Sequence, residues 1–110
     1  MEVKYKVCGK IMMLRLDLGE RVKPKKVQKL IRDIKQMIES HAKDGVRYVV
    51  VCGDFPEYVY PLIAKHLEEC ANVLCIFDRT HGPVVVSSNT IYYEEGDVIK
   101  LPKELYHFAV

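Results

Sequence analysis

Residues 46–52 read VRYVVVC and residues 73–77 read VLCIF, and these two stretches decide the fold. Each holds an unbroken apolar run of four or five residues, which is typical of a strand buried on both faces of a parallel sheet. A helical pattern separates the two runs. We therefore expect them to be parallel neighbours joined by a right-handed helical crossover.

Two segments have the apolar spacing of helices. Pro24 opens the first, which runs from about Lys25 to Lys43 with apolar residues every three or four positions. The second follows a turn at Gly53–Pro56 and ends near Cys70. Pro61 is either the first-turn proline of this helix or the site of a bend.

The remaining segments complete the sheet. Val3 to Leu18 reads as a β-hairpin, a fifth strand starts at Val84, and Val98–Leu101 reads as a short edge strand. The apolar tail, Leu105–Val110, docks onto the body or onto a partner. The sequence thus predicts one α/β domain over residues 1–110, of order β-β-α-β-α-β-β, with a mixed sheet of five to six strands and two helices on one face.

The second face of this sheet needs a cover. Both crossovers move the same way across the sheet, so both helices lie on one side, yet the two apolar runs read as buried on both sides. A second copy of the chain is the simplest candidate, which predicts a homodimer or larger oligomer. The alternative is that the apolar tail and the N-terminal hairpin fold over this face.

Charge and cysteine content limit the class of protein. The net charge of +2 permits an anionic ligand, but DNA is not expected because a long nucleic acid needs a stronger basic stripe. The basic cluster at Lys23–Lys29 reads as the solvated first turn of a helix.

No apolar stretch could span a bilayer. The first six residues alternate charged and apolar side chains as a strand does, which is not the pattern of a signal peptide, so we expect a cytoplasmic protein. This location argues against a disulfide framework, and the spacing of the four cysteines argues against a zinc site.

Ligands of open α/β sheets bind where parallel strands end. The first such end carries Gly53 and Asp54. Glycine would let a ligand approach the backbone, and free amides before the next helix would favour an anion. The alternative role of Asp54 is to cap that helix.

The second strand end reads Asp78-Arg79-Thr80-His81-Gly82. Arg79 can bind a phosphate with two parallel hydrogen bonds, and His81 can move a proton near neutral pH. Asp78 could orient either side chain, or bind a divalent metal together with Asp54. The alternative is an ordinary polar hairpin turn.

Three further residues are candidates of lesser weight. His66 lies at the margin of the apolar stripe of the second helix, where a histidine is either structural or catalytic. Ser87 and Ser88 follow the valine run of the fifth strand, and they either face a ligand or end the strand.

A series of short motifs runs from Gly53 to Leu101. Its members are Gly53 and Pro56, Phe77-Asp78-Arg79, Gly82, Val84-Val85-Val86, Ser87-Ser88 and Gly96-Asp97-Val98-Ile99. In order and spacing the series resembles the Csx-three type of type III CRISPR-associated proteins, the small ring nucleases that degrade cyclic tetra-adenylate. The chain departs from the family where Asp54 replaces an arginine, where Arg79 stands one position early, and where the histidine-rich helix keeps only His66.

The resemblance implies a ferredoxin-like α/β dimer and an antiviral function. Cyclic tetra-adenylate would be held between dimers, so that side chains of different subunits meet at each scissile phosphate. A ribose 2′-hydroxyl or water would attack phosphorus. Arg79 would then stabilise charge, His81 or His66 would move the proton, and Asp78 would orient them or hold a metal.

The same resemblance gives Gly53 and Ser88 contacts with the ligand. The family has also been described as acting on RNA ends with manganese, so short RNA is the second expected ligand and manganese the expected metal. The departures from the family pattern leave open a protein that binds the cyclic nucleotide without cutting it. They also leave open an assembly module of the same fold.

Overall fold

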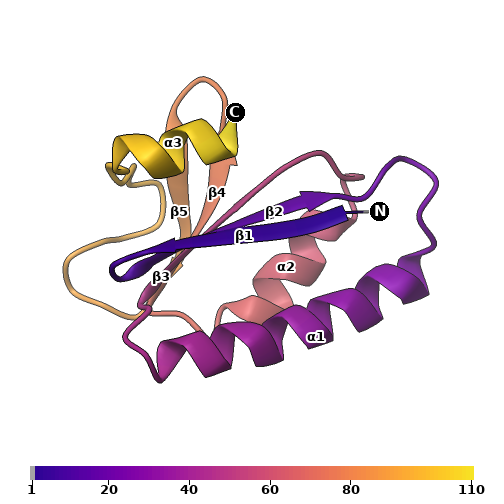
Figure 1. Ribbon diagram of the computed structural model, residues 1–110, viewed down its shortest axis with the longest axis horizontal. Coiled ribbons are helices and arrows are strands. Elements are labelled where there is room, and N and C mark those ends of the chain that lie inside the picture. The colour runs from indigo at the N-terminus through magenta and orange to yellow at the C-terminus, as the bar shows by residue number, and fades with distance from the viewer. Residues whose placement is uncertain (1) are drawn as a thin grey trace.

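The computed structural model describes residues 2–110. Its five strands form one sheet in chain order, β1-β2-β3-β4-β5 (Figure 1). The elements are β1 (Glu2–Cys8), β2 (Ile11–Asp17), α1 (Pro24–Ala42), β3 (Tyr48–Cys52), α2 (Val59–Leu67), β4 (Val73–Asp78), β5 (Gly82–Ser88) and α3 (Lys103–Ala109). This architecture confirms the predicted α/β class with a mixed sheet, and it is compatible with a ferredoxin-like two-layer sandwich.

The three central strands run in the same direction, as predicted. In the register of the parallel pairs, Leu14 of β2 lies opposite Val51 of β3, which in turn lies opposite Ile76 of β4. The outer strands β1 and β5 are antiparallel to their neighbours. The carboxyl ends of β2, β3 and β4 therefore lie along one side of the sheet, which we call the carboxyl edge. The amino ends of the same strands lie along the opposite side, which we call the amino edge.

The twist of the sheet spreads the carboxyl edge out. Neighbouring strands are rotated relative to one another by the usual right-handed twist. As a result the β4–β5 turn stands at the top of the molecule in Figure 1, while the loop from β2 to α1 lies at the far right. The strand exits thus share an edge without forming one continuous polar rim.

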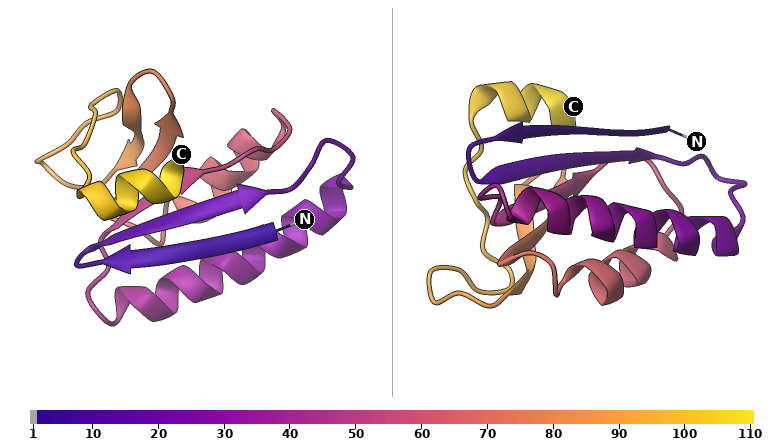
Figure 2. Two further views of the ribbon diagram at one scale, coloured as in Figure 1. Left: turned by 45° about the horizontal axis from the view of Figure 1, so that its top comes forward. Right: turned by 60° about the horizontal axis from the view of Figure 1, so that its bottom comes forward.

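The helices α1 and α2 cover one face of the sheet, as Figure 2 shows from two sides. The face of α1 that packs inward is the apolar stripe read from the sequence, and its buried members are Val27, Ile31, Ile34 and Ile38. Alternate strand residues such as Leu14 and Val49 meet this stripe in the larger core cluster. Burial of this stripe is the main stabilisation of a helix that has no side-chain cap.

The tail forms α3 and covers part of the second face. Leu105 is fully buried there against Met13, Val50 and Cys75, which belong to the second core cluster. Arg15 of β2 fastens the end of this helix, because its Nη1 donates to the backbone carbonyl of Phe108 at 3.3 Å and to that of Ala109 at the same distance. Ile99 and Leu101, from the segment before α3, pack into the same cluster, whereas the N-terminal hairpin stays in the sheet as β1 and β2.

Two boundaries differ from the sequence prediction. The expected edge strand at Val98–Leu101 is reduced to a single bridge between Val84 and Val98, because Pro102 lacks an amide and the chain turns there into α3. Helix α2 begins at Val59, later than expected, so Pro61 is its first-turn proline rather than a bend. Neither α1 nor any other helix in residues 2–110 is long and apolar enough to cross a membrane.

Candidate functional site

The β3 exit is tied to the neighbouring strand. Gly53 has a φ of 116°, and a Cβ at this position would collide with the backbone of Leu16. The amide of Asp54 donates to Oδ1 of Asp17 at 3.1 Å, and the carbonyl of Asp54 accepts from the amide of Leu18 at 3.0 Å. The glycine is thus required by the close approach of β2, and this contact is sufficient to explain why a glycine stands there.

The β3 exit lies ahead of the N-terminus of α2 in the chain. Tyr58 is the N-cap of α2 and makes no side-chain capping bond, so Asp54 does not cap this helix. The amides of Gly53 and Asp54 therefore lie outside the helix N-terminus, and the helix dipole does not reach them. Ligand contacts by these two residues remain a prediction.

An ion pair at the end of β2 was missed by the sequence reasoning. Nε of Arg15 lies 2.8 Å from Oδ2 of Asp17, and the two side chains are partly buried. The hydrogen bond from Arg15 holds the pKa of Asp17 below its usual range, and the Asp54 amide adds to this effect. The sequence did contain an indication of this pair. Both charged residues alternate with apolar residues on a strand whose second face is covered, and charges in such a place need a partner.

The β4–β5 turn brings Asp78 and His81 together. Oδ2 of Asp78 accepts from the backbone amide of His81 at 2.9 Å and lies 2.8 Å from its Nδ1. These hydrogen bonds lower the pKa of Asp78 from its ordinary value, the side-chain bond contributing most. With Nδ1 donating to the carboxylate, Nε2 is the nitrogen free to exchange a proton with a ligand. Two of the four predicted catalytic residues, Asp78 and His81, thus form a dyad that also shapes the turn.

The dyad borders a hollow of about 460 Å³. Its lining includes Thr80, His81, Pro83, Lys100 and Tyr106, from the turn, the return segment after β5, and α3. The ring of Tyr106 is placed by an edge-on contact with Phe77, at 5.6 Å between centroids. The lining therefore includes a histidine, a lysine and a tyrosine, which are residue types that suit an anionic ligand such as a phosphate.

Lys100 and Tyr106 escaped the sequence reasoning for a topological reason. The Val98–Leu101 segment was read as an edge strand, and its antiparallel return along β5 would have brought Lys100 near Gly82. Tyr106 lies on α3, for which the sequence showed only an apolar tail. Arg79 is exposed beside the dyad, and residues 2–110 offer it no hydrogen bond or ion pair.

The other three predicted site residues lie at the amino edge. Ser87 and Ser88 pair with Leu74 and Val73 at the start of β4, at the opposite end of the sheet from Asp78. His66 is in the last turn of α2, which returns the chain to that same edge. Within one chain, His66 and both serines are therefore separated from the dyad, and they could join it only from another copy.

The dyad does not fit a protein-held manganese ion. Nδ1 of His81 and Oδ2 of Asp78 are engaged with each other, which removes two of the atoms that a metal would need. Across residues 2–110 no group of three or more His, Cys, Asp or Glu side chains is placed to hold a metal ion. We therefore derive no chemical step through a metal.

The cysteines are free thiols in all four cases. Burial raises the pKa of Cys52 to about 11 and that of Cys75 to about 12, so neither supplies a thiolate near neutral pH. Both pack as small apolar side chains beneath α3. Their burial makes them packing residues of the core.

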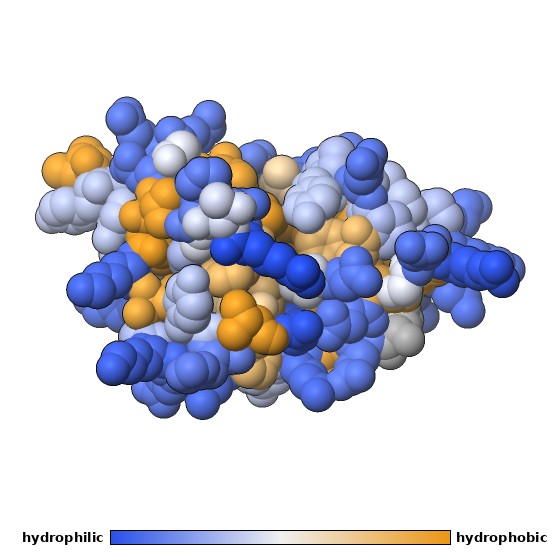
Figure 3. Space-filling view, turned by 90° about the horizontal axis from the view of Figure 1, so that it is seen from above, coloured by the Kyte–Doolittle hydropathy of each residue, from blue (hydrophilic) through white to orange (hydrophobic). Residues whose placement is uncertain are grey.

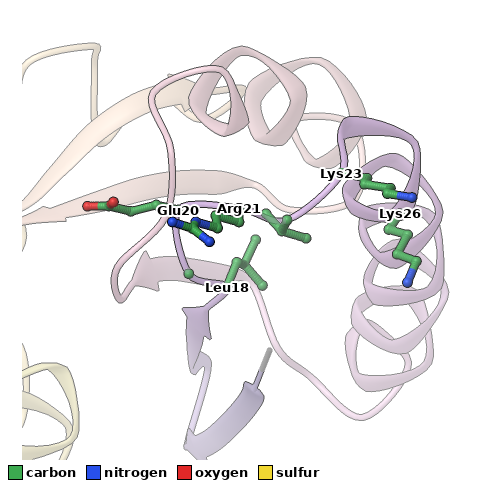
Figure 4. Close-up of a pocket in the computed structure, with 7 residues that line it drawn as sticks. Leu18, Glu20, Arg21, Lys23 and Lys26 are labelled. Carbon is green, nitrogen blue, oxygen red and sulfur yellow. The ribbon is translucent and has the colours of Figure 1, made fainter.

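A second hollow, of about 570 Å³, opens where the chain passes from β2 to α1. Figure 4 shows Lys23 and Lys26 on the helix side, Glu20 on the far side, and Leu18 between them. Its lining is Leu18, Gly19, Glu20, Arg21, Val22, Lys23 and Lys26. We call it the basic hollow, because three cations and one carboxylate surround an apolar floor.

Fold and site together define a small α/β protein with an exposed Asp-His dyad beside an anion-compatible hollow. The family model described as "CRISPR-associated protein (Cas_csx3)" matches residues 18–100. The chain belongs to this family, and the predicted resemblance is confirmed. No curated protein matches the chain significantly.

Proposed function

We propose that this protein binds cyclic tetra-adenylate and cleaves it at the β4–β5 turn, with RNA 3′ ends as the second substrate class. The observation that carries the proposal is the Asp78–His81 dyad beside a hollow lined by Lys100 and Tyr106. Membership of a CRISPR-associated family supports this substrate class. The free thiols are those expected of a cytoplasmic protein.

The cleavage step uses groups that the turn already holds. A ribose 2′-hydroxyl attacks the adjacent phosphorus, the bond from phosphorus to the 5′-oxygen breaks, and a 2′,3′-cyclic phosphate forms. Nε2 of His81 takes the proton of the attacking hydroxyl, and Asp78 stabilises the imidazolium through Nδ1. Arg79 and Lys100 offset the charge that gathers on the phosphoryl oxygens. A protonated His81 of another copy, or water, supplies the proton for the leaving 5′-oxygen.

The size of the hollow supports a site shared between copies. Hollows of roughly 300–1,000 Å³ hold one drug-sized ligand, so the space of about 460 Å³ suits one nucleotide of the ring rather than all four. His66 and Ser88 lie at the amino edge, away from the dyad of their own chain. A ring held between copies would bring the two edges to one ligand.

The decisive test is turnover by a variant that removes only the free imidazole. His81→Ala should lower the rate of cyclic tetra-adenylate opening by about 10²–10⁴-fold, since this is the usual contribution of a general base. His107→Ala removes another exposed histidine, on α3, and should leave the rate unchanged. Product is measured by chromatography. The enzyme proposal fails if the wild-type protein leaves both the ring and a short RNA intact, with and without manganese.

A second candidate function is capture of the cyclic nucleotide without cleavage. The side chain of His81 is 69% exposed, and water surrounding it would weaken any proton transfer that needs a dry site. A tight complex in calorimetry, without product in the same sample, would select this function. In that case Lys100→Ala should weaken binding, while His81→Ala should have a smaller effect.

A further inference from the structure

The first half of α1 and the loop before it concentrate the positive charge of the molecule. Residues 21–32 contain six cations and no carboxylate, whereas the whole chain has a net charge of only +2, so the rest of the chain is net negative. The side chains of all six cations are exposed. We call this set the basic stripe, and its members are Arg21, Lys23, Lys25, Lys26, Lys29 and Arg32.

Folding does not account for this concentration of charge. The first turn of α1 holds no carboxylate, although the helix dipole would favour one there, and lysines occupy it instead. Lys29 follows Lys25 by four positions and precedes Arg32 by three, so like charges are neighbours along the helix and repel one another. Glu20 and Asp33 flank the stripe, but within residues 2–110 no carboxylate forms an ion pair with it. The stripe is therefore better explained by an anionic ligand than by the stability of the helix.

The stripe runs from the carboxyl edge along α1. Arg21 and Lys23 lie in the loop that follows β2, and with Lys26 they line the basic hollow (Figure 4). Further along the helix, Lys26 and Lys29 border a smaller hollow of about 300 Å³. The view from above shows hydrophilic side chains at the end of the molecule where this loop turns (Figure 3). The cations thus form one continuous, open surface rather than a closed pocket.

The composition of the stripe favours a phosphate backbone over an acidic protein. Four of the six members are lysines, which are depleted in protein–protein interfaces, whereas lysine binds phosphates readily as a point charge. No Phe, Tyr or Trp occurs between Tyr5 and Tyr48, so the stripe itself has no aromatic platform on which bases could stack. The stripe is also short, since α1 rises only about 10 Å from Lys25 to Arg32. It therefore suits a few phosphates of a single strand rather than a long duplex.

The stripe and the Asp78–His81 dyad are reached from the same edge but lie on different sides of the sheet. The loop with Arg21 follows β2 at the carboxyl edge, and Asp78 ends β4 at that edge. From there α1 passes under one face of the sheet, and Figure 1 shows it at the bottom of the molecule with the β4–β5 turn at the top. A small ring bound at the turn therefore stays clear of the stripe, and only a longer strand could contact both.

We propose that the basic stripe binds the phosphate backbone of a single-stranded RNA whose 3′ end occupies the β4–β5 turn. The choice of RNA rests on the proposed function, in which RNA 3′ ends are the second substrate class. The contacts are independent of base sequence, because phosphates carry no sequence information, and they require no cleavage. Binding releases counterions, so affinity falls as salt is raised. The stripe thus adds affinity for long RNA and none for cyclic tetra-adenylate.

The first test compares two triple variants that change the net charge by the same amount. One variant replaces three members of the stripe, Lys25→Gln, Lys29→Gln and Arg32→Gln. The matched control replaces three exposed cations outside the stripe, Lys10→Gln, Lys43→Gln and Lys65→Gln. Glutamine has nearly the helix propensity of lysine and arginine, so both variants should fold.

Affinity for an oligo-uridylate of about 16 nucleotides is measured by fluorescence anisotropy at several salt concentrations. The stripe variant should bind about 10–100-fold more weakly than the wild type at about 0.1 M salt, and its logarithmic salt slope should be shallower by about 2, since each lost phosphate contact accounts for about 0.7. The control variant should keep the wild-type slope. Equal losses in the two variants, or a wild-type protein that binds no RNA even at about 0.05 M salt, would overturn the proposal.

The second test separates the stripe from the dyad by the length of the RNA. The stripe variant should lose affinity for about 16 nucleotides but keep its affinity for about 4 nucleotides, which the turn alone can hold. Its rate of cyclic tetra-adenylate opening should equal that of the wild type. An equal loss for both lengths contradicts the proposed path. A wild-type protein that opens no ring yet binds long RNA through the stripe would refute the proposed function and support the stripe.

A competition experiment distinguishes RNA from an acidic protein. Polyglutamate with the same number of charges as the oligo-uridylate should displace the labelled RNA less effectively than unlabelled RNA does. Equal displacement by the two polymers would show that the stripe accepts acidic proteins as well as RNA, and the assignment of RNA would then be wrong.

Discussion

The β3 exit and the β4 exit leave the same edge of the sheet, and both carry polar residues after a buried strand. The two exits differ in what their residues contact. At the β3 exit, Gly53 accommodates the backbone of Leu16 and the backbone of Asp54 bonds to β2. At the β4 exit, Asp78 and His81 bond to each other and remain exposed beside a hollow. A polar loop after a parallel strand is therefore a strong candidate site only where its polar groups are not already hydrogen-bonded to a neighbouring strand.

The largest expected effect is structural and falls at the β3 exit. Gly53→Ala places a Cβ against the backbone of Leu16 at a positive φ, so it should lower the free energy of unfolding by about 3 kcal/mol or more. Gly9→Ala is the matched control, because Gly9 has a φ of 59° and open space around it. It should cost only about 1 kcal/mol. Urea unfolding measures the free energy of unfolding of both variants. Equal losses of this free energy would mean that β2 does not constrain the β3 exit.

A smaller effect is expected from the link between the two strands. Asp17→Asn weakens the contacts of Asp17 with Arg15 and with the Asp54 amide, and it should cost about 1–2 kcal/mol. Because the folded pKa of Asp17 is lowered, its stabilisation is present above pH of about 4 and is lost as pH falls through that lower value. Unfolding measured at several acidic pH values should show a shallower loss for this variant than for the wild type. An identical pH profile would show that the ion pair adds no stability.

The smallest expected effect on stability is at the β4 exit. His81→Ala should change the free energy of unfolding by no more than about 0.5 kcal/mol, because its side chain is exposed. This variant should nevertheless lose cleavage, whereas Gly53→Ala should lose activity only in proportion to the folded fraction. A strongly destabilised His81→Ala protein would make the dyad a structural turn and remove the contrast between the two exits.

The candidate site was only half accessible to sequence reasoning. Asp78 and His81 are three residues apart in a turn, so their meeting could be expected from local geometry. Lys100 and Tyr106 reach the same hollow from segments that fold back after β5, and no local pattern indicates that return. Ser87 and Ser88 were grouped with the dyad, but the antiparallel direction of β5 places them at the other edge.

By itself the sequence determined the order of elements from β1 to β5, the parallel centre of the sheet and the inward face of α1, because these follow from apolar spacing within short segments. Only the tertiary structure decided that α3 covers the second face, that Gly53 meets Leu16, and that the predicted site divides between two edges. Contacts of this kind join segments distant in the chain. They depend on strand register, strand direction and sheet twist, which no local pattern contains.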